Sequence, residues 1–302
     1  MSLNPHIGER PQPARKQSEA EVILSLNEFR KIASILYEES GIYLQESKSA
    51  LVQSRLAKRL RTLGLRSFRD YCALLAGADG VNERTKMIGA LTTNVTKFFR
   101  EPHHFEHLAK KVMPPLIESA RRGGRVRFWS AGCSSGQEPY SMALTILSAM
   151  PDAAIHDVRV LASDIDADMV DAGRRGVYSE TALAGVPGDV LERWFTPVGP
   201  KKGKRAESWS VGEELRQIVA FRELNLNGEW PMRGKFNAIF CRNVVIYFEE
   251  KTQATLWSRF EQQLTRDGVL YVGHSERVTG PAAADFRFDG NTTYRLNDGG
   301  PS

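Results

Sequence analysis

The 302-residue sequence contains few cysteines and no long apolar run. A membrane-spanning helix needs an apolar stretch of about 18 residues or more, so we expect none. The start of the chain, Met1–Lys16, is polar and lacks the apolar centre of a secretory signal, and residues 1–20 are expected to be a disordered tail. Cys72, Cys133 and Cys241 lie far apart, which argues against a disulfide framework or a zinc site and fits a reducing cytoplasm.

The composition is that of an ordinary soluble globular protein. Hydrophobic residues make up 41% and charged residues 25% of the chain. The length is long for one domain and suggests two. The net charge of +5 is a modest excess, compatible with either a nucleic-acid partner or an acidic protein partner. Where the basic residues lie is therefore more informative than their sum.

Residues 21–92 are predicted to form a small all-helical domain, because apolar residues recur there at helical spacing between glycine stops. The first expected helix starts after an N-cap at Asn27 and stops at Gly41. The other expected helices cover 46–63, 67–75 and 82–91. The second helix is basic, with Lys48, Arg55, Lys58, Arg59 and Arg61. A solvated face is the common explanation of such a run. Because these cations have no acidic partner one turn away, Arg55, Lys58 and Arg59 are alternatively candidates for docking an acidic protein.

A linker and connecting helix at 93–122 lead into an α/β domain at 123–297. Short apolar segments that read as strands alternate there with helical patterns, which is typical of a mostly parallel sheet with helices on both faces. Right-handed crossovers place the carboxyl ends of the strands at one edge, where ligands bind. A stretch at about 195–220 breaks the alternation and is expected to form a small inserted antiparallel β-subdomain.

The loop Gly132–Gly136 follows the first predicted strand and is followed by Glu138. Glycines at such a turn allow close approach to a ligand, although a plain strand-to-helix turn also favours them. The spacing differs from the dinucleotide-binding pattern, and the carboxylate of Glu138 would repel a pyrophosphate. A dehydrogenase is thus the weakest alternative, and a ligand with an amino group is favoured.

Three further polar residues follow predicted strands at the same edge. Asp164 ends the second strand, where a carboxylate commonly binds ribose hydroxyls; its alternative role is to cap the next helix, which Asp166 serves better. Asn225 and Asn243 could each bind an adenine edge or cap a helix. Together with Glu138 these residues outline a nucleoside pocket.

The linker segment Asn94–Arg100 joins the helical domain to the sheet domain. It carries polar side chains together with two aromatic anchors, Phe98 and Phe99. A fixed linker between two domains lies where a cleft is expected. The following pair, His103 and His104, is not interpreted as a metal site because the sequence shows no third ligand near it.

At these residues the chain resembles the bacterial chemotaxis receptor (protein-glutamate) O-methyltransferases of the CheR family, over roughly residues 25–296. Five segments carry the resemblance in the family's order: 94–100, 134–141, 162–166, 240–248 and 273–276. The resemblance implies a Rossmann-like methyltransferase sheet that uses S-adenosylmethionine (SAM) and yields S-adenosylhomocysteine, an N-terminal helical domain and an inserted β-subdomain. The cofactor residues that it implies are Asn94, Thr96, Arg100, Glu138, Asp164, Asn225, Leu226, Arg242 and Asn243.

The family's reaction converts receptor glutamates into γ-methyl esters during sensory adaptation. Arg100 would align the incoming carboxylate, and Tyr247 would reach the same site unless it is only a core aromatic. The implied partner is the helical bundle of the receptor's cytoplasmic part, served by a cytoplasmic monomer that needs no metal and neither binds nucleic acid nor inserts into membrane. The alternatives are a SAM-dependent methyltransferase of RNA or a small molecule, and a non-catalytic protein that senses SAM or the receptor.

Overall fold

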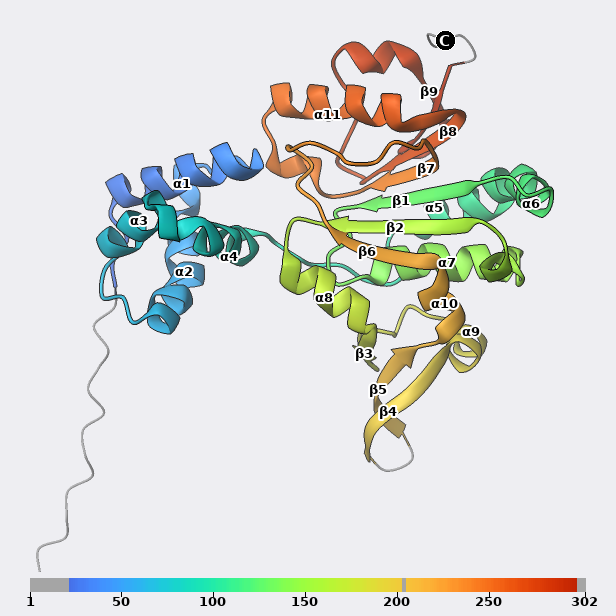
Figure 1. The fold of residues 1–302 in the computed structure, drawn as a ribbon, viewed down its shortest axis with the longest axis horizontal. Coiled ribbons are helices and arrows are strands. Elements are labelled where there is room, and N and C mark those ends of the chain that lie inside the picture. The colour runs from blue at the N-terminus through green and yellow to red at the C-terminus, as the bar shows by residue number, and fades with distance from the viewer. Residues whose placement is uncertain (1–21, 203–204, 298–302) are drawn as a thin grey trace, which may run out of the picture.

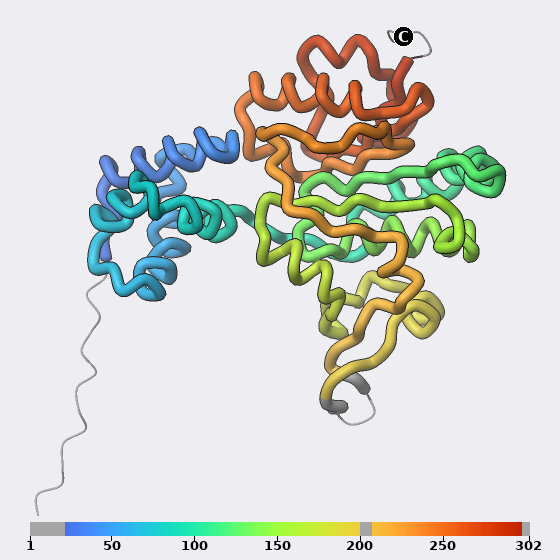
Figure 2. The backbone as a smooth tube through the Cα atoms, in the orientation of Figure 1, coloured from blue at the N-terminus to red at the C-terminus, as the bar shows by residue number. Residues whose placement is uncertain are grey.

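The computed structural model describes residues 22–202 and 205–297. The tail expected at residues 1–20 lies outside these ranges. A helical domain stands beside a larger α/β domain, and a small second sheet projects from the latter (Figures 1 and 2). Within the described ranges, no helix combines the length and the apolar character needed to cross a bilayer.

The N-terminal domain is all helical, as expected. Its helices are α1 Leu26–Ser40, η1 Glu46–Lys48, α2 Ser49–Leu63, α3 Phe68–Ala76, η2 Ala78–Gly80 and α4 Val81–Leu91. The N-cap of α1 is Ser25 rather than Asn27: the Ser25 hydroxyl accepts from the Glu28 amide, and the Glu28 carboxylate accepts from the Ser25 amide at 2.9 Å. This reciprocal pair satisfies two amides, which Asn27 inside the first turn could not do.

The main sheet has seven strands in the order β6-β2-β1-β7-β8-β10-β9. The first five pair in parallel, and β10 and β9 are antiparallel additions. The bounds are β1 Val126–Ala131, β2 Val158–Asp164, β6 Val219–Glu223, β7 Phe236–Cys241, β8 Leu264–Val272, β9 Phe286–Gly290 and β10 Thr293–Leu296. Strands β2 and β6 extend to Asp164 and Glu223, so both deliver polar residues to the carboxyl edge.

Helices cover both faces of this sheet, which confirms the expected α/β, Rossmann-like class (Figure 1). One face packs against α5 Pro102–His107, η3 Leu108–Val112, α6 Met113–Arg121, α7 Gln137–Ala149, α8 Ala167–Arg175 and α10 Glu213–Ile218. The other packs against α11 Glu250–Gln263 and η6 Pro281–Asp285. The remaining short helices are η4 Ala153–Ile155 and η5 Val245–Tyr247. Helix α7 is buried along nearly its whole length, so its first turn is rigidly placed below the sheet edge.

The small sheet is antiparallel, in the order β3-β5-β4, with β3 Val177–Ser179, β4 Phe195–Lys202, β5 Arg205–Val211 and the helix α9 Gly188–Trp194. It therefore starts before the expected 195–220 stretch, and the end of that stretch belongs to β6 of the main sheet. Three residues are too short a run to predict β3 from sequence. Its pairing with β5 covers one edge of the hairpin.

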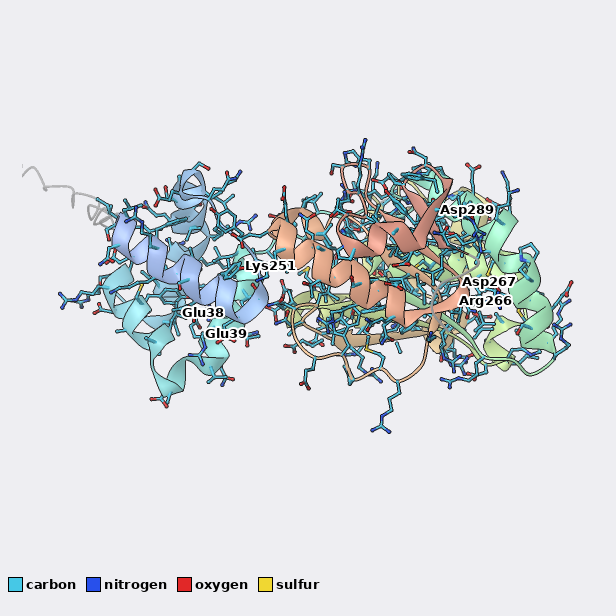
Figure 3. All side chains as sticks on the ribbon, turned by 90° about the horizontal axis from the view of Figure 1, so that it is seen from above. Glu38, Glu39, Lys251, Arg266, Asp267 and Asp289 are labelled. Carbon is cyan, nitrogen blue, oxygen red and sulfur yellow. The ribbon has the colours of Figure 1, made fainter. Side chains whose placement is uncertain are left out.

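The helical domain is joined to the α/β domain at the end of α1. Ile42 forms an antiparallel bridge with Phe248, and the Tyr37 hydroxyl donates to the Glu249 carboxylate at 2.8 Å. Figure 3 shows the same junction from above, with Glu38 and Glu39 of α1 next to Lys251 at the start of α11. The two domains are thus held side by side by these contacts.

Candidate functional site

A cavity of about 550 Å³ lies between the helical domain and the carboxyl ends of the central strands. A volume of this size is typical of small-molecule sites. All the residues that the sequence suggested for cofactor binding and catalysis line it: Asn94, Thr96, Arg100, Glu138, Asp164, Asn225, Leu226, Arg242, Asn243 and Tyr247. Segments far apart in the sequence thus converge on one place.

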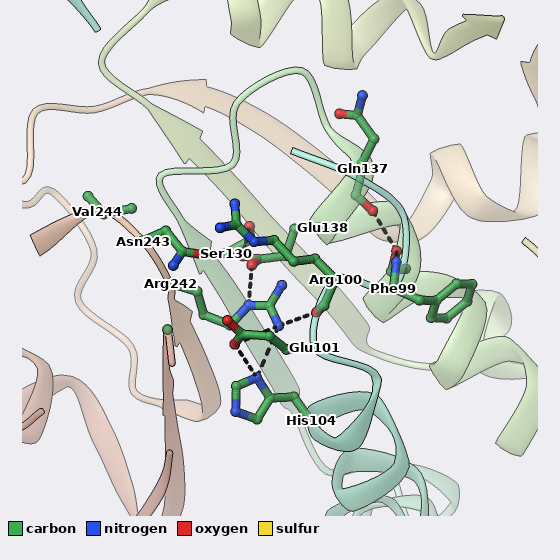
Figure 4. Close-up of polar contacts among 12 residues, drawn as sticks. Phe99, Arg100, Glu101, His104, Ser130, Gln137, Glu138, Arg242, Asn243 and Val244 are labelled. Atoms are coloured by element: carbon green, nitrogen blue, oxygen red, sulfur yellow. Dashed lines mark hydrogen bonds and ion pairs between the residues drawn. The ribbon is translucent and has the colours of Figure 1, made fainter. Parts of the chain in front are cut away.

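The floor of the cavity contains a buried ion pair. The Arg242 Nε donates to Glu138 Oε2 at 2.7 Å, and Glu138 Oε1 accepts from the Ser130 hydroxyl at 2.7 Å. The Arg242 Nη1 also donates to the Arg100 carbonyl at 2.5 Å and to Nδ1 of His104 at 3.0 Å (Figure 4). Burial and the neighbouring guanidinium lower the pKa of His104 to about 3, so its ring is neutral and can accept.

Asp164 is held at the end of β2 by main-chain amides. Its Oδ2 accepts from the Ser134 amide at 2.7 Å and its Oδ1 from the Asp166 amide at 3.0 Å. Burial raises the pKa of Asp164 to about 6, against the lowering effect of these hydrogen bonds. Asp166 caps α8 through the Asp168 amide, as expected, which leaves Asp164 directed at the cavity.

The glycine loop is built for close packing. Gly132 and Gly136 have backbone φ angles of +87° and +95°, which residues with a side chain rarely adopt. A Cβ on Gly132 would lie 2.3 Å from Val244, and one on Gly136 would lie 2.8 Å from the Tyr178 hydroxyl. The loop thus needs glycine at both ends for its conformation and for its packing against two other segments.

Two asparagines at the cavity are already engaged in fixing its walls. The Asn94 amide donates to the Asp166 carboxylate at 2.9 Å, and the Asn225 amide donates to the Glu39 carbonyl of the helical domain at 2.6 Å. The side-chain Oδ1 of Asn225 accepts from the main-chain amide of Asn227 at 2.9 Å. No helix follows Asn225 among the described residues between β6 and β7, so its side chain closes a local turn and does not cap a helix.

Arg100 and Tyr247, the residues expected to act on the substrate, are more exposed than the residues of the cavity floor. Arg100 is half-buried, and its Nη1 donates to the Val95 carbonyl at 3.1 Å. Tyr247 is 36% exposed, so it is a residue of the cavity rather than a core aromatic. The Tyr247 carbonyl accepts from the Tyr43 amide at 2.9 Å, so the helical domain holds this loop in place.

Comparison with known proteins identifies the two parts of the chain. Residues 27–92 match the family model described as "CheR methyltransferase, all-alpha domain", and residues 94–294 match "CheR methyltransferase, SAM binding domain". The chain belongs to the CheR methyltransferase family. It is therefore a SAM-dependent methyltransferase, and the cavity at the sheet edge is where its cofactor is expected.

Several curated relatives are similar along nearly their whole length. A probable chemotaxis protein methyltransferase of Rhizobium etli is 49% identical over 266 residues, covering 88% of this chain and 98% of the relative. Chemotaxis protein methyltransferase 2 of Pseudomonas aeruginosa is 42% identical, covering 88% and 92%. The chemotaxis protein methyltransferase of Escherichia coli is 39% identical, covering 91% and 92%.

The cavity of this CheR-family chain suits SAM in its own chemistry. Glu138 and Asp164 are both 7% exposed, so the floor carries two buried carboxylates. Carboxylates can accept hydrogen bonds from an ammonium and from ribose hydroxyls, whereas they repel a pyrophosphate. Gly132 also lines the cavity and adds no side chain to it.

Glu276 is a residue of the site whose role the sequence did not show. Its Oε2 accepts from the amides of Gly273 and Asn243 at 2.6 and 2.7 Å, and its Oε1 from those of Val244 and Val245 at 2.9 and 3.0 Å. Asn243 has φ +60°, a strained conformation that these bonds stabilise. Glu276 lies in the segment 273–276 that carries the family resemblance, but no spacing rule links a carboxylate there to a loop thirty residues earlier.

Arg55, Lys58 and Arg59 of α2 line a separate hollow together with Asp166 and Asp168. Arg59 has no acidic partner one turn away, as expected, but it is paired across the domain with Glu83, through Nε at 2.9 Å and Nη2 at 2.5 Å. The partner comes from α4, which a search for neighbours one turn away cannot find. Arg55 donates to the carbonyls of Leu91 and Thr92 at 2.7 Å, and Lys58 is exposed.

Among the described residues, Glu101, His103 and His104 offer ligand atoms within 4.8 Å of one another, so a third polar group does lie beside the histidine pair. The Nδ1 of His104 already accepts from Arg242, and the Arg242 Nη1 lies 3.7 Å from Glu101 Oε2. A cation placed there would face a guanidinium. This cluster therefore supports the ion pair of the cavity floor.

The raised pKa of Asp164 gives a testable pH dependence. Because its carboxylate is the form that accepts ribose hydroxyls, SAM affinity should fall as pH drops through about 6, approaching a tenfold loss per pH unit below it. Calorimetric titration between pH 5 and 8 measures this. Asp164→Asn should bind more weakly at pH 7.5 and lose the slope, and an equal slope in both proteins would assign the titration to another group.

Glu276→Gln tests the amide cluster. The substitution keeps the side-chain size but puts a donor against two of the four amides, which should cost about 2 kcal/mol of stability or more and lower turnover. Urea unfolding and SAM-saturated turnover measure both effects. Glu250→Gln, at an exposed position of α11, is the matched control, and identical behaviour of the two variants would show that Glu276 does not hold the loop.

Proposed function

We propose that this enzyme transfers the methyl group of SAM to glutamate side chains of chemotaxis receptors, giving γ-methyl esters. The observation that carries the proposal is the position of Arg100, a cation that lines the cavity above the two buried carboxylates of its floor. A carboxylate substrate would be attracted to such a group. The relatives named as chemotaxis protein methyltransferases, similar over nearly the whole chain, support the same choice.

Little chemical activation is required of the protein. A glutamate carboxylate is ionised at neutral pH, so no strong general base is needed. When bound, SAM supplies a methyl group on a sulfonium, which is already reactive. The residues must align the carboxylate with that methyl group and exclude water from the approach.

Each of the site residues then has a task. Glu138 would accept from the cofactor's amino group, with Arg242 and Ser130 fixing its orientation. Asp164 would accept from the ribose hydroxyls. Among the described residues, Arg100 donates to a single carbonyl, that of Val95, and therefore keeps N–H groups for a substrate carboxylate.

Tyr247 has a supporting role in this proposal. Its main chain is fixed by the Tyr43 amide, and its side chain lines the cavity with its hydroxyl available for a hydrogen bond. A neutral donor would hold the carboxylate less strongly than a guanidinium does. The balance matters, because a tight ion pair with Arg100 would make the carboxylate a poorer nucleophile.

Three basic side chains of α2, those of Arg55, Lys58 and Arg59, are proposed to orient the receptor helix. Receptor methylation regions are glutamate-rich helical bundles, so a cationic face complements them. Because Arg55 and Arg59 are engaged within the helical domain, Lys58 is the member of this group with the most exposed charge. A cytoplasmic location and action as a monomer without nucleic acid remain part of the proposal.

The decisive experiment incubates the enzyme with radiolabelled SAM, a receptor cytoplasmic fragment and total RNA. The proposal expects label on the receptor that is released by mild base, as a methyl ester requires. Base-stable label on the receptor, or label on RNA, would indicate another substrate class.

Arg100→Ala should lower receptor methylation about 100-fold, because the carboxylate loses its aligning cation. Tyr247→Phe should lower it less, since the ring remains. Initial rates at saturating SAM and calorimetric SAM affinity separate alignment from cofactor binding. Lys97→Ala, a nearby exposed linker position outside the cavity lining, is the control. Full activity of Arg100→Ala would remove this residue from the mechanism.

Lys58→Glu should raise the receptor KM roughly fivefold at low salt, since a charge reversal changes an exposed ion pair by about 1 kcal/mol. The difference should vanish at high salt while SAM affinity stays the same. Lys111→Glu on η3 makes the same change in net charge away from the helical domain. Arg59→Glu is unsuitable, because it would set a carboxylate against Glu83. Equal KM values for the two lysine variants would show that the basic residues of α2 form an ordinary solvated face that does not contact the receptor.

A further inference from the structure

The mouth of the cofactor cavity carries a group of exposed apolar side chains. The exposed fractions are 50% for Tyr43, 40% for Leu51, 77% for Val95, 47% for Ile246 and 36% for Tyr247. All five line the cavity, whereas Glu138 and Asp164 at its floor are 7% exposed. We refer to these five side chains as the apolar rim.

This grouping is unusual for a protein surface. Thirteen large hydrophobic residues are exposed in the described part of the chain, and five of them lie on this one cavity. Single exposed apolar residues are common, but a cluster of them marks an interaction site. The rim is therefore a surface that a partner covers during the enzyme's work.

The five rim residues line one cavity although they come from both domains. Tyr43 and Leu51 belong to the helical domain, Val95 to the linker, and Ile246 and Tyr247 to the loop after β7. The hydrogen bond from the Tyr43 amide to the Tyr247 carbonyl joins the two walls, as does the bridge between Ile42 and Phe248. A partner seated on the rim would thus contact both domains at once.

The charges beside the rim indicate what this partner carries. Lys48 and Arg100 also line the cavity, and neither has an ion-pair partner among the described residues. The carboxylates of the cavity are both buried at its floor. A segment that combines a carboxylate with apolar side chains would be complementary, whereas a uniformly acidic segment would leave the rim uncovered.

We propose that the apolar rim binds the side chains that flank the target glutamate, and so selects glutamates whose helical neighbours are apolar. The inference rests on the proposed function and adds a selection rule to it. On a helix, residues three and four positions from the glutamate share its face. When the glutamate enters the cavity, those neighbours come to lie on the rim. Attraction to α2 would then bring receptors near, and the rim would decide which glutamate is used.

Two rim positions have matched controls in the same chain. Val95→Asn is compared with Val81→Asn, an exposed valine at the start of α4, and Leu51→Asn with Leu63→Asn, at the other end of the same helix. Each rim variant should raise the receptor KM roughly fivefold, the effect of losing ~40 Å² of buried apolar contact. SAM affinity, kcat and unfolding midpoint should match those of the paired control.

The salt dependence separates this effect from charge attraction. The KM ratio between a rim variant and its control should persist at high ionic strength, because apolar contact is not screened. On the substrate side, serine is placed three and four residues from a methylated glutamate of the receptor fragment, with the glutamate kept. This change should lower its methylation by wild-type enzyme and should matter less for the rim variants.

The outcomes distinguish this inference from the function on which it rests. If wild-type enzyme forms base-labile label on the receptor but each rim variant has the KM of its control, the inference is overturned and the proposed function stands. If no base-labile label forms on the receptor at all, the proposed function fails, and the selection rule fails with it. Raised KM values at both salt concentrations support the rim.

Discussion

The buried ion pair between Glu138 and Arg242 is the contact on which the rest of the site depends. Arg242 directly follows β7, and Glu138 lies in the first turn of α7. The Arg242 guanidinium also donates to the Arg100 carbonyl of the linker and to the ring of His104. Removing one partner of a buried pair costs about 3–5 kcal/mol, because the other charge is left uncompensated. This energy keeps the linker against the sheet edge. It thereby fixes the side chain that faces the substrate relative to the groups that face the cofactor.

The loops around this pair are held in conformations that they would not adopt alone. Phe99, Glu101, Ser134 and Asn243 all have positive φ without being glycine. Each such residue costs about 1 kcal/mol or more, which persists only where the surroundings compensate. The compensation is visible: Asp164 accepts from the Ser134 amide and Glu276 from the Asn243 amide. Both buried carboxylates, those of Asp164 and Glu276, therefore anchor main chain.

The sequence predicted those parts of the structure that local chemistry determines. Glycine stops and apolar spacing located the helices of the N-terminal domain. The predicted end of the second strand placed Asp164 at the sheet edge and left Asp166 to cap the next helix. The parts it did not predict depend on contacts between distant segments. Arg59 finds Glu83 on another helix, β3 is defined only by its pairing with β5, and Glu276 acts on a loop thirty residues away. Of these residues only Glu276 lies in a segment that carries the family resemblance, and only the fold shows which atoms are brought together.

The two-domain construction has a further physical consequence. Asn94 lies between the cofactor cavity and the basic hollow of α2, lines both, and bonds to Asp166 at the start of α8. A charge that pulls on α2 therefore acts on the same linker that carries Arg100 and Val95. The two walls of the cavity are joined by hydrogen bonds of Tyr43 and Asn225, and elsewhere by an ion pair between Lys86 and Asp168. Ile165 of the α/β domain also packs against the helical core. In the proposed function, a receptor held at α2 and a carboxylate held at Arg100 would thus both lie beside one short segment of main chain.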